Sequence, residues 1–267
     1  MANTTVLWET DRRGVATVTL NRPEVNNAYN GELIQGLHAA MDDLGRRRDL
    51  RVVVLRGNGR HFQAGADLKW LRDVARQSPE ENERVSRATA DATHRLNTLP
   101  VPTVALVQGG CFGGGTGFVA VCDVVIAADN AIFSISETRW GIMAGIILPQ
   151  LNDAMGVRQV RRYALTGERF DAYEARRIGF VHEVVAAAEL GSRGARMVDQ
   201  LLQNAPEATA QTKAVTLERA WSKISPETFD RLITQHAAKR RSEEAAEGLA
   251  SFAEKRAARW YPAPNSA

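Results

Sequence analysis

The 267-residue sequence lacks several features that would each point to a class of protein. Its two cysteines, Cys111 and Cys122, are too few for a disulfide framework, so we expect a reducing, cytoplasmic setting. Its most apolar stretch, 101–128, is interrupted by proline, glutamine, glycine and aspartate. It therefore contains no run of the roughly 18 to 20 apolar residues that a membrane-spanning helix needs. Residues 1–5 show neither a basic start nor an apolar segment, so we expect no signal peptide.

The sequence also lacks a strong charge bias and a metal-ligand pattern. Its net charge is +3, and its densest basic clusters, at 46–48, 239–241 and 255–256, are typical of solvated helix faces. No stretch interleaves aromatic and basic residues for base stacking, so nucleic acid is not an expected partner. The five histidines are scattered without ligand spacing, and we therefore predict no metal site.

What the sequence does contain is an alternation of short apolar segments with helical ones through its first two thirds. Strands are predicted at 14–20, 52–55, 103–107, 124–127, 131–134 and 181–185. Helices are predicted from a cap at Asn30, across 67–99 with a break at Ser78-Pro79, at 147–155, 157–165 and 172–178, and repeatedly between 187 and 258. The order predicts an α/β core over 1–200 and a helical region over 201–267.

Two turns have the composition of a catalytic main-chain site. The first is 61–69, which follows the predicted strand at 52–55; Gly65 permits a tight turn, and Ala66-Asp67 opens the next helix. The second is the glycine-rich run 109–117, again between a strand and a helix, where a ligand can approach the backbone closely. An amide at a helix start has no partner inside the helix. One amide from each turn, aimed at a common point, would form an oxyanion hole, with each donor worth on the order of 3 kcal/mol.

The glycine run allows other interpretations. A phosphate loop is disfavoured because the Walker lysine and its Ser/Thr are absent. The segment 115–120 formally fits a dinucleotide fingerprint, although it lies late in the run. Small residues also serve tight packing between a helix and a strand. A hydrolase with a nucleophile elbow is disfavoured, since no Gly-x-Ser-x-Gly occurs.

Eight short segments follow one another along nearly the whole chain, at 61–69, 109–117, 122–128, 133–137, 141–142, 164–168, 175–181 and 252–256. Together they resemble the enoyl-CoA hydratase/isomerase (crotonase) family. The resemblance implies a spiral of ββα units with a C-terminal helical region that mediates trimers, which commonly pair into hexamers. It also implies an acyl-CoA thioester as the ligand and no separate cofactor, because coenzyme A is part of the substrate.

The resemblance also assigns roles to individual positions. It implies that the amides of Ala66 and Gly114 form the oxyanion hole and that Glu137 is the catalytic acid/base. The implied substrate-binding residues around them are Ala64, Asp67, Leu68, Lys69 and Gly113. Lys255 is a candidate for binding the CoA phosphates, of its own or a neighbouring subunit.

The sequence departs from the family pattern at Gly117, where hydratases have the first of two catalytic glutamates. A single carboxylate can in principle activate a water at C3 and return a proton at C2. Related isomerases use a single carboxylate at the Glu137 position to shuttle a proton. A hydratase is therefore the main hypothesis and a double-bond isomerase the alternative. A CoA- or RNA-binding protein without catalysis is the alternative of another class.

Within the family, the chain resembles the branch that hydrates 3-substituted glutaconyl-CoA thioesters, such as 3-methylglutaconyl-CoA, because it shares Gly117 and the pattern at 161–166. The segment after Glu137 differs from that branch. Trp140, Ala144 and Gly145 are expected to bind the acyl group, with small residues leaving room for a larger branch. This favours isohexenylglutaconyl-CoA, an intermediate of terpene degradation. The candidate partners for its distal carboxylate are Lys69, Arg72, Arg76 and Arg139.

Overall fold

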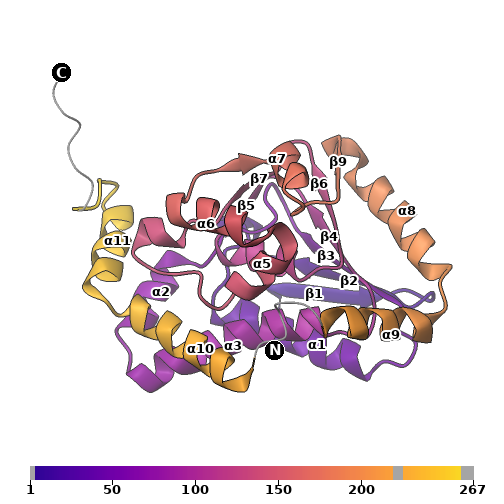
Figure 1. Cartoon of the computed structure of the whole chain (residues 1–267), viewed down its shortest axis with the longest axis horizontal. Helices are drawn as coiled ribbons and strands as arrows, with labels where there is room; N and C mark the ends of the chain where they lie inside the picture. The colour runs from indigo at the N-terminus through magenta and orange to yellow at the C-terminus, as the bar shows by residue number, and fades with distance from the viewer. Residues whose placement is uncertain (1–3, 219–224, 260–267) are drawn as a thin grey trace.

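The computed structural model describes residues 4–218 and 225–259, and its framework is a six-stranded sheet (Figure 1). The strands, in spatial order, are β1 (Val6–Thr10), β2 (Val15–Leu20), β3 (Val52–Gly57), β4 (Thr103–Val107), β6 (Val124–Ala128) and β9 (Glu183–Val185). β1 is antiparallel to β2, and the later pairs are parallel. A second, three-stranded sheet contains β5 (Gly110–Phe112), β7 (Ile132–Ser134) and β8 (Phe170–Asp171).

From β4 on, the chain contributes strands alternately to the two sheets and so forms a spiral. After β4 come β5 and helix α4 (Gly114–Ala120). After β6 come β7, the short 3-10 helix η2 (Glu137–Trp140), α5 (Leu148–Met155) and α6 (Val157–Thr166). After β3, a single bridge joins Gln63 to Cys111 of β5 before α2 (Leu68–Ala75) begins. This repetition of strand, strand and helix confirms the predicted α/β spiral of ββα units.

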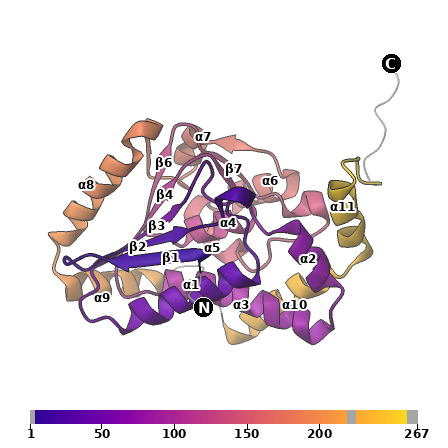
Figure 2. The same cartoon turned by 180° about the vertical axis from the view of Figure 1, so that it is seen from behind.

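The large sheet is buried on both faces because side chains along a strand alternate between two cores. In β3, Val53 and Leu55 belong to the main core, to which α1 (Gly31–Arg46) and α3 (Pro79–Asn97) contribute. Val52 and Val54 belong to a smaller cluster under α8 (Leu190–Leu202). Figure 2 shows α8 and α1 on opposite sides of the strands. Burial on both faces is what the wholly apolar stretch 52–55 predicts.

Local capping interactions begin α1 and α3 where the sequence predicts. The side chain of Asn30 accepts a hydrogen bond from the amide of Leu33 at 3.0 Å and caps α1. Ser78 caps α3 in the same way, and Pro79 occupies its first turn, so the helical stretch 67–99 divides into α2 and α3. The remaining short elements are η1 (Pro23–Val25), α7 (Ala172–Arg177) and η3 (Ala187–Glu189).

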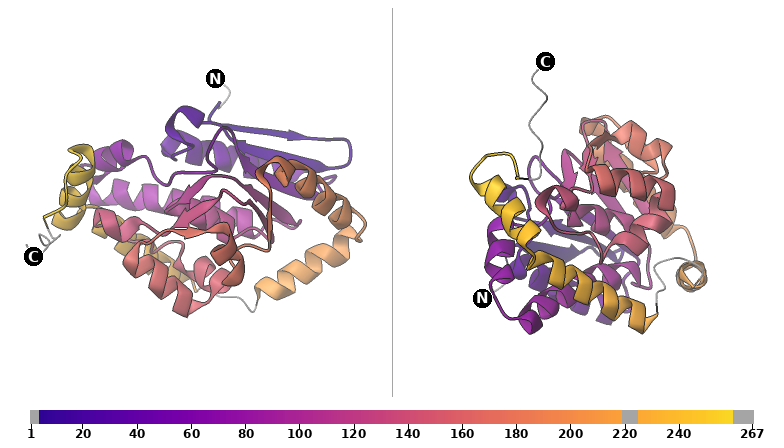
Figure 3. Two further views of the ribbon diagram at one scale, coloured as in Figure 1. Left: turned by 90° about the horizontal axis from the view of Figure 1, so that it is seen from above. Right: turned by 60° about the vertical axis from the view of Figure 1, so that its left-hand side comes forward.

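The helices near the C-terminus differ in how much they contact the rest of the chain (Figure 3). α10 (Pro226–Arg240) lies along α3, and α11 (Glu243–Ala253) contacts η2 and α2. By contrast, α9 (Pro206–Leu217) buries none of its residues, and an ion pair of 2.7 Å between Lys213 and Asp123 ties it to the core. The division of the chain at residue 200 and the trimer stay predictions. Within 4–218 and 225–259, no helix is long and apolar enough to cross a membrane.

Candidate active site

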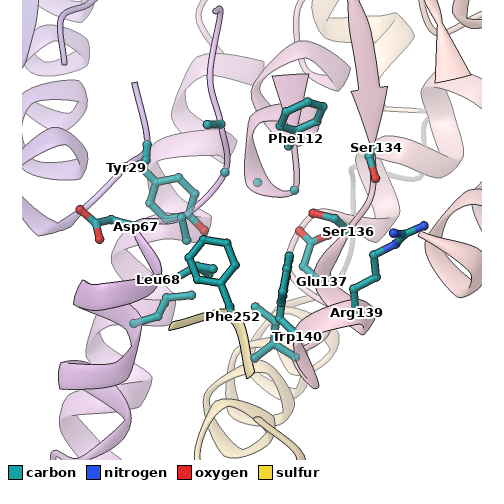
Figure 4. Close-up of a pocket in the computed structure, with 18 of the residues that line it drawn as sticks. Tyr29, Asp67, Leu68, Phe112, Ser134, Ser136, Glu137, Arg139, Trp140 and Phe252 are labelled. Carbon is teal, nitrogen blue, oxygen red and sulfur yellow. The ribbon is translucent and has the colours of Figure 1, made fainter. Parts of the chain in front are cut away.

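A cavity of about 620 Å³ lies where the two turns, 61–69 and 109–117, meet the C-terminal helices (Figure 4). This volume lies within the usual range for small-molecule sites. One wall is formed by Tyr29 and the turn at 61–69. A second is formed by the glycine-rich turn at 109–117 together with η2, and a third by α10 and α11. Nine of the predicted site residues line the cavity: Ala64, Ala66, Asp67, Leu68, Lys69, Gly113, Gly114, Glu137 and Trp140.

The amide of Ala66 faces the glycine turn because of how its segment is held. On one side, the amide of Tyr29 donates to the carbonyl of Gly65 at 2.9 Å, and the amide of Asp67 donates to the carbonyl of Tyr29 at 2.8 Å. Successive residues of an extended chain point their N–H groups to opposite sides. Ala66 therefore points its N–H away from Tyr29, and this amide donates to no residue in the described part of the chain.

The amide of Gly114 lies across a short gap from it. The preceding amide, of Gly113, donates to the carbonyl of Ser134 at 2.9 Å, whereas Gly114 is the first residue of α4, so its N–H has no acceptor within the helix. The two turns touch: a methyl group placed on Gly113 would lie 3.7 Å from the Cα of Gly65. Gly113 has a φ of +51°, a conformation that glycine adopts without strain. The structure thus brings the two predicted oxyanion-hole turns together.

Glu137 places its carboxyl group beside this gap. It is the first residue of η2 and is 8% exposed. A methyl group on Gly113 would lie 3.3 Å from its Oε1, while its Oε2 is buried without a hydrogen-bond partner in the described structure. Burial raises the pKa of Glu137 from 4.5 to about 7, against a smaller lowering from a backbone hydrogen bond. A carboxyl group with this pKa can both accept and donate a proton near neutral pH.

The structure explains how Gly117 is accommodated. A methyl group there would lie 2.4 Å from the Cγ2 of Ile147, a side chain only 2% exposed. Any larger residue at Gly117, including the glutamate found in hydratases, would require Ile147 to move. The isoleucine therefore fills the space beside the missing first carboxylate.

Three predicted residues lie outside the cavity lining, which corrects part of the expected acyl site. Ala144 is buried in the main core, and Gly145 faces the side chain of Met143 and the backbone of Leu232. The segment after η2 forms a turn in which the amide of Ile147 donates to the carbonyl of Ala144, and its two small residues do not form the expected wall of the cavity. Lys255 also does not line the cavity of its own chain.

Tyr29 is a site residue that the sequence analysis missed. A methyl group on Gly114 would lie 2.7 Å from its Cε1 and 2.9 Å from its hydroxyl oxygen. Burial and the charge of Glu137 raise the pKa of Tyr29, so its hydroxyl stays protonated. In Figure 4, Tyr29 and Glu137 enter from opposite sides of the cavity. No motif marks Tyr29, because its position depends on contacts with residues 85 positions away.

The cavity carries several cations. Lys69, Arg139 and Arg169 line it and are exposed, whereas the predicted carboxylate partners Arg72 and Arg76 do not line it. Arg240 also lines it and is 3% exposed. The expectation that the cluster 239–241 lies on a solvated face is therefore wrong for Arg240.

Two further features define the walls. Trp140 and Phe252 meet edge to face with ring centroids 5.0 Å apart, which joins η2 to α11. Asp67 caps α2 by accepting from the amides of Lys69 and Trp70, and it lies 3.5 Å from Arg22. In the described ranges, no group of three or more His, Cys, Asp or Glu side chains is placed to hold a metal ion.

Comparison with known proteins places the chain in a family. The enoyl-CoA hydratase/isomerase model matches residues 10–262. A putative enoyl-CoA hydratase of Thermus thermophilus is 32% identical over 94% of this chain and 99% of its own length. A mitochondrial Delta(3,5)-Delta(2,4)-dienoyl-CoA isomerase of Dictyostelium discoideum is 29% identical over 94% of this chain and 88% of its own length. The crystal structure of an enoyl-CoA hydratase from Shewanella pealeana matches with a TM-score of 0.78 and 34% identity over 96% of both chains. The chain belongs to the enoyl-CoA hydratase/isomerase (crotonase) family, which acts on CoA thioesters.

Proposed function

We propose that this protein is an enoyl-CoA hydratase that adds water across the α,β double bond of a CoA thioester. One observation carries the proposal: the buried carboxyl group of Glu137, with one oxygen unpartnered, lies beside the gap between the amides of Ala66 and Gly114. The gap suits an oxygen that gains negative charge, and the carboxyl group suits proton transfer at the neighbouring carbons.

The proposed reaction needs one acid/base group. The thioester oxygen accepts hydrogen bonds from Ala66 and Gly114. Ionised Glu137 takes a proton from water while the water oxygen bonds to C3, and the electrons of the double bond move to form an enolate. Protonated Glu137 then gives its proton to C2, which restores both the thioester and the carboxylate. Because Ile147 fills the space beside Gly117, no second carboxylate takes part at that position.

The proposed substrate is a 3-branched glutaconyl-CoA, with isohexenylglutaconyl-CoA favoured and 3-methylglutaconyl-CoA next. Apolar walls of the cavity support a branch: the predicted Trp140 lines it together with Leu71, Ile142 and Phe252, whereas Ala144 and Gly145 do not. We expect kcat/KM to rise from crotonyl-CoA to 3-methylglutaconyl-CoA to isohexenylglutaconyl-CoA. A higher value for unbranched crotonyl-CoA would contradict the proposed branch.

Incubation in ¹⁸O-labelled water tests hydration directly. We expect the conjugated absorbance of an α,β-unsaturated thioester to fall while one labelled oxygen appears at C3 of the product. The alternative is the isomerase, which would also use Glu137 alone. A β,γ-unsaturated thioester that gains conjugation without taking up label, with no hydration of the α,β isomer, would favour it. Binding of CoA esters without turnover of either substrate would favour a protein that has no catalytic activity.

We also propose a cytoplasmic trimer or pair of trimers, as the family resemblance implies. Lys255 would then bind the CoA phosphates of a neighbouring subunit, since it does not line the cavity of its own chain. Replacing Lys255 with methionine should raise KM for every CoA ester by a similar factor. A monomeric mass in sedimentation would contradict this assignment.

A further inference from the structure

Arg240 is a buried cation without an acidic partner. It ends α10 and is 3% exposed, yet it makes no ion pair with any residue in 4–218 or 225–259. Its Nε donates to Oδ1 of Asn82 at 3.2 Å, and its Nη2 donates to the carbonyl of Asn82 at 3.0 Å and to Oγ of Ser86 at 2.7 Å. These contacts with α3 fix the guanidinium group but leave its charge uncompensated. A buried charge in that condition is unfavourable unless a counter-ion binds.

The groups around Arg240 are neutral. His236, one turn earlier on α10, places Nδ1 3.0 Å from Oγ of Ser86, and burial together with Arg240 lowers the pKa of this histidine to about 3. Tyr29 feels the charges of both Glu137 and Arg240, and its pKa is raised, so it too is neutral. The two residues of α10 that line the cavity, His236 and Arg240, therefore carry one net positive charge at neutral pH.

The geometry leaves one nitrogen of Arg240 for a ligand. Nε and Nη2 are held by α3, whereas Nη1 donates to no residue of the described chain, and the side chain lines the cavity. The other lining cations, Lys69, Arg139 and Arg169, are exposed, so water can solvate them. An exposed cation suits the hydrated phosphates of coenzyme A, whereas a desolvated one suits an anion that enters the cavity.

We propose that Arg240 determines specificity by binding a carboxylate on the acyl part of the substrate. The substrate class is then the CoA thioesters of dicarboxylic acids, and Asn82 and Ser86 are positioning residues that hold the guanidinium group. This inference rests on the proposed hydratase function and adds to it the residue that recognises the distal acid. It replaces Arg72 and Arg76 as candidates, and it leaves Lys69 and Arg139 for the outer part of the cavity.

The test compares two substrates that differ in the carboxylate. In Arg240→Met, kcat/KM for 3-methylglutaconyl-CoA should fall at least about 30-fold, mainly through KM, because a desolvated charge contact is lost. For 3-methylcrotonyl-CoA, which has the same branch and no distal acid, it should change less than about threefold. The control is Arg231→Met, an exposed arginine on the same helix, which should alter neither value. An equal loss for both substrates in a folded Arg240→Met would show a structural or CoA-binding role and overturn the proposal.

A binding measurement on the unmodified protein covers the case in which Arg240→Met does not fold. Glutaryl-CoA and pentanoyl-CoA are saturated, so neither can be hydrated, and they differ at the end of a five-carbon chain. Titration calorimetry should show glutaryl-CoA binding at least about tenfold more tightly. Equal affinity, or tighter binding of pentanoyl-CoA, would overturn the role of Arg240. Because this preference does not depend on turnover, it separates failure of this inference from failure of the proposed hydration.

Discussion

The two sides of the cavity are built by different means. The side where we propose that the reaction takes place consists of backbone amides at Ala66 and Gly114 and one carboxyl group at Glu137, each positioned by a short segment after a strand. The side formed by α10 and α11 consists of side chains, such as Arg240 and Phe252, positioned by packing against α2, α3 and η2. We infer that the side with Ala66, Gly114 and Glu137 carries out the chemistry, whereas the side formed by α10 and α11 determines which acyl group is accepted.

The largest expected effect is on Glu137. Replacing it with glutamine should lower kcat at least about a thousandfold, because the isosteric amide cannot exchange the proton. The affinity for a saturated CoA ester should change little. The matched control is Glu189→Gln, an exposed glutamate far along the chain, which should keep full activity. Turnover that survives in Glu137→Gln would remove this residue from the mechanism.

The raised pKa of Glu137 has a consequence for stability. Since its pKa is about 7 in the folded protein and 4.5 ordinarily, the folded state holds this proton more tightly than the unfolded chain does. The associated stability is fully present below about pH 4.5 and is lost as the pH rises through about 7, by roughly 3 kcal/mol. Urea unfolding at pH 5 and pH 8 should show this loss in the native protein and a smaller one in Glu137→Gln. Equal losses in the two proteins would show that Glu137 does not titrate in this range.

Gly114→Ala should lower kcat about a hundredfold. The added methyl group would lie 2.7 Å from the ring of Tyr29, so the turn at 109–117 must shift. The amide of residue 114 then no longer points at the thioester oxygen. Adding Tyr29→Ala should relieve the collision and restore part of the activity. No recovery in the double variant, with both proteins folded, would mean that the collision is not the cause.

The smallest effect is expected on the helical side. Phe252→Ala removes the ring that meets Trp140 and should lower kcat/KM for a branched substrate about tenfold, with little change for crotonyl-CoA. Leu165→Ala removes an exposed side chain away from the cavity and serves as the control. A loss in Phe252→Ala that is equal for both substrates would break the division between chemistry and selectivity.

Sequence reasoning predicts the features that depend on local chemistry. The caps at Asn30 and Ser78 and the buried strand at 52–55 need nothing beyond their own neighbourhoods. The two turns are also recognisable, since their glycines mark close backbone approach. The short strands β1, β5 and β8 were not predicted. β5 and β8 contain only three and two residues, and they exist because distant segments pair with them.

The side formed by α10 and α11 depends on tertiary packing, so it is harder to predict from the sequence. Arg240 stands in the sequence between Lys239 and Arg241, and nothing local distinguishes it from them. It is buried because the face of α10 that carries Arg240 packs against Asn82 and Ser86, which lie more than 150 residues away along the chain. Ala144 and Gly145 give the opposite error, because the sequence predicts them at the cavity and they do not line it. A small residue indicates free space only when the direction it faces is known.

The central claim is that two amides polarise one thioester beside Glu137. Isotope-edited infrared spectroscopy of crotonyl-CoA labelled with ¹³C at C1 tests it, with Glu137→Gln as the protein because this variant should bind the substrate without hydrating it. We expect the carbonyl band to move to lower wavenumber on binding and to return toward its solution position when Gly114→Ala is added. A bound carbonyl band at its solution position in Glu137→Gln would contradict it.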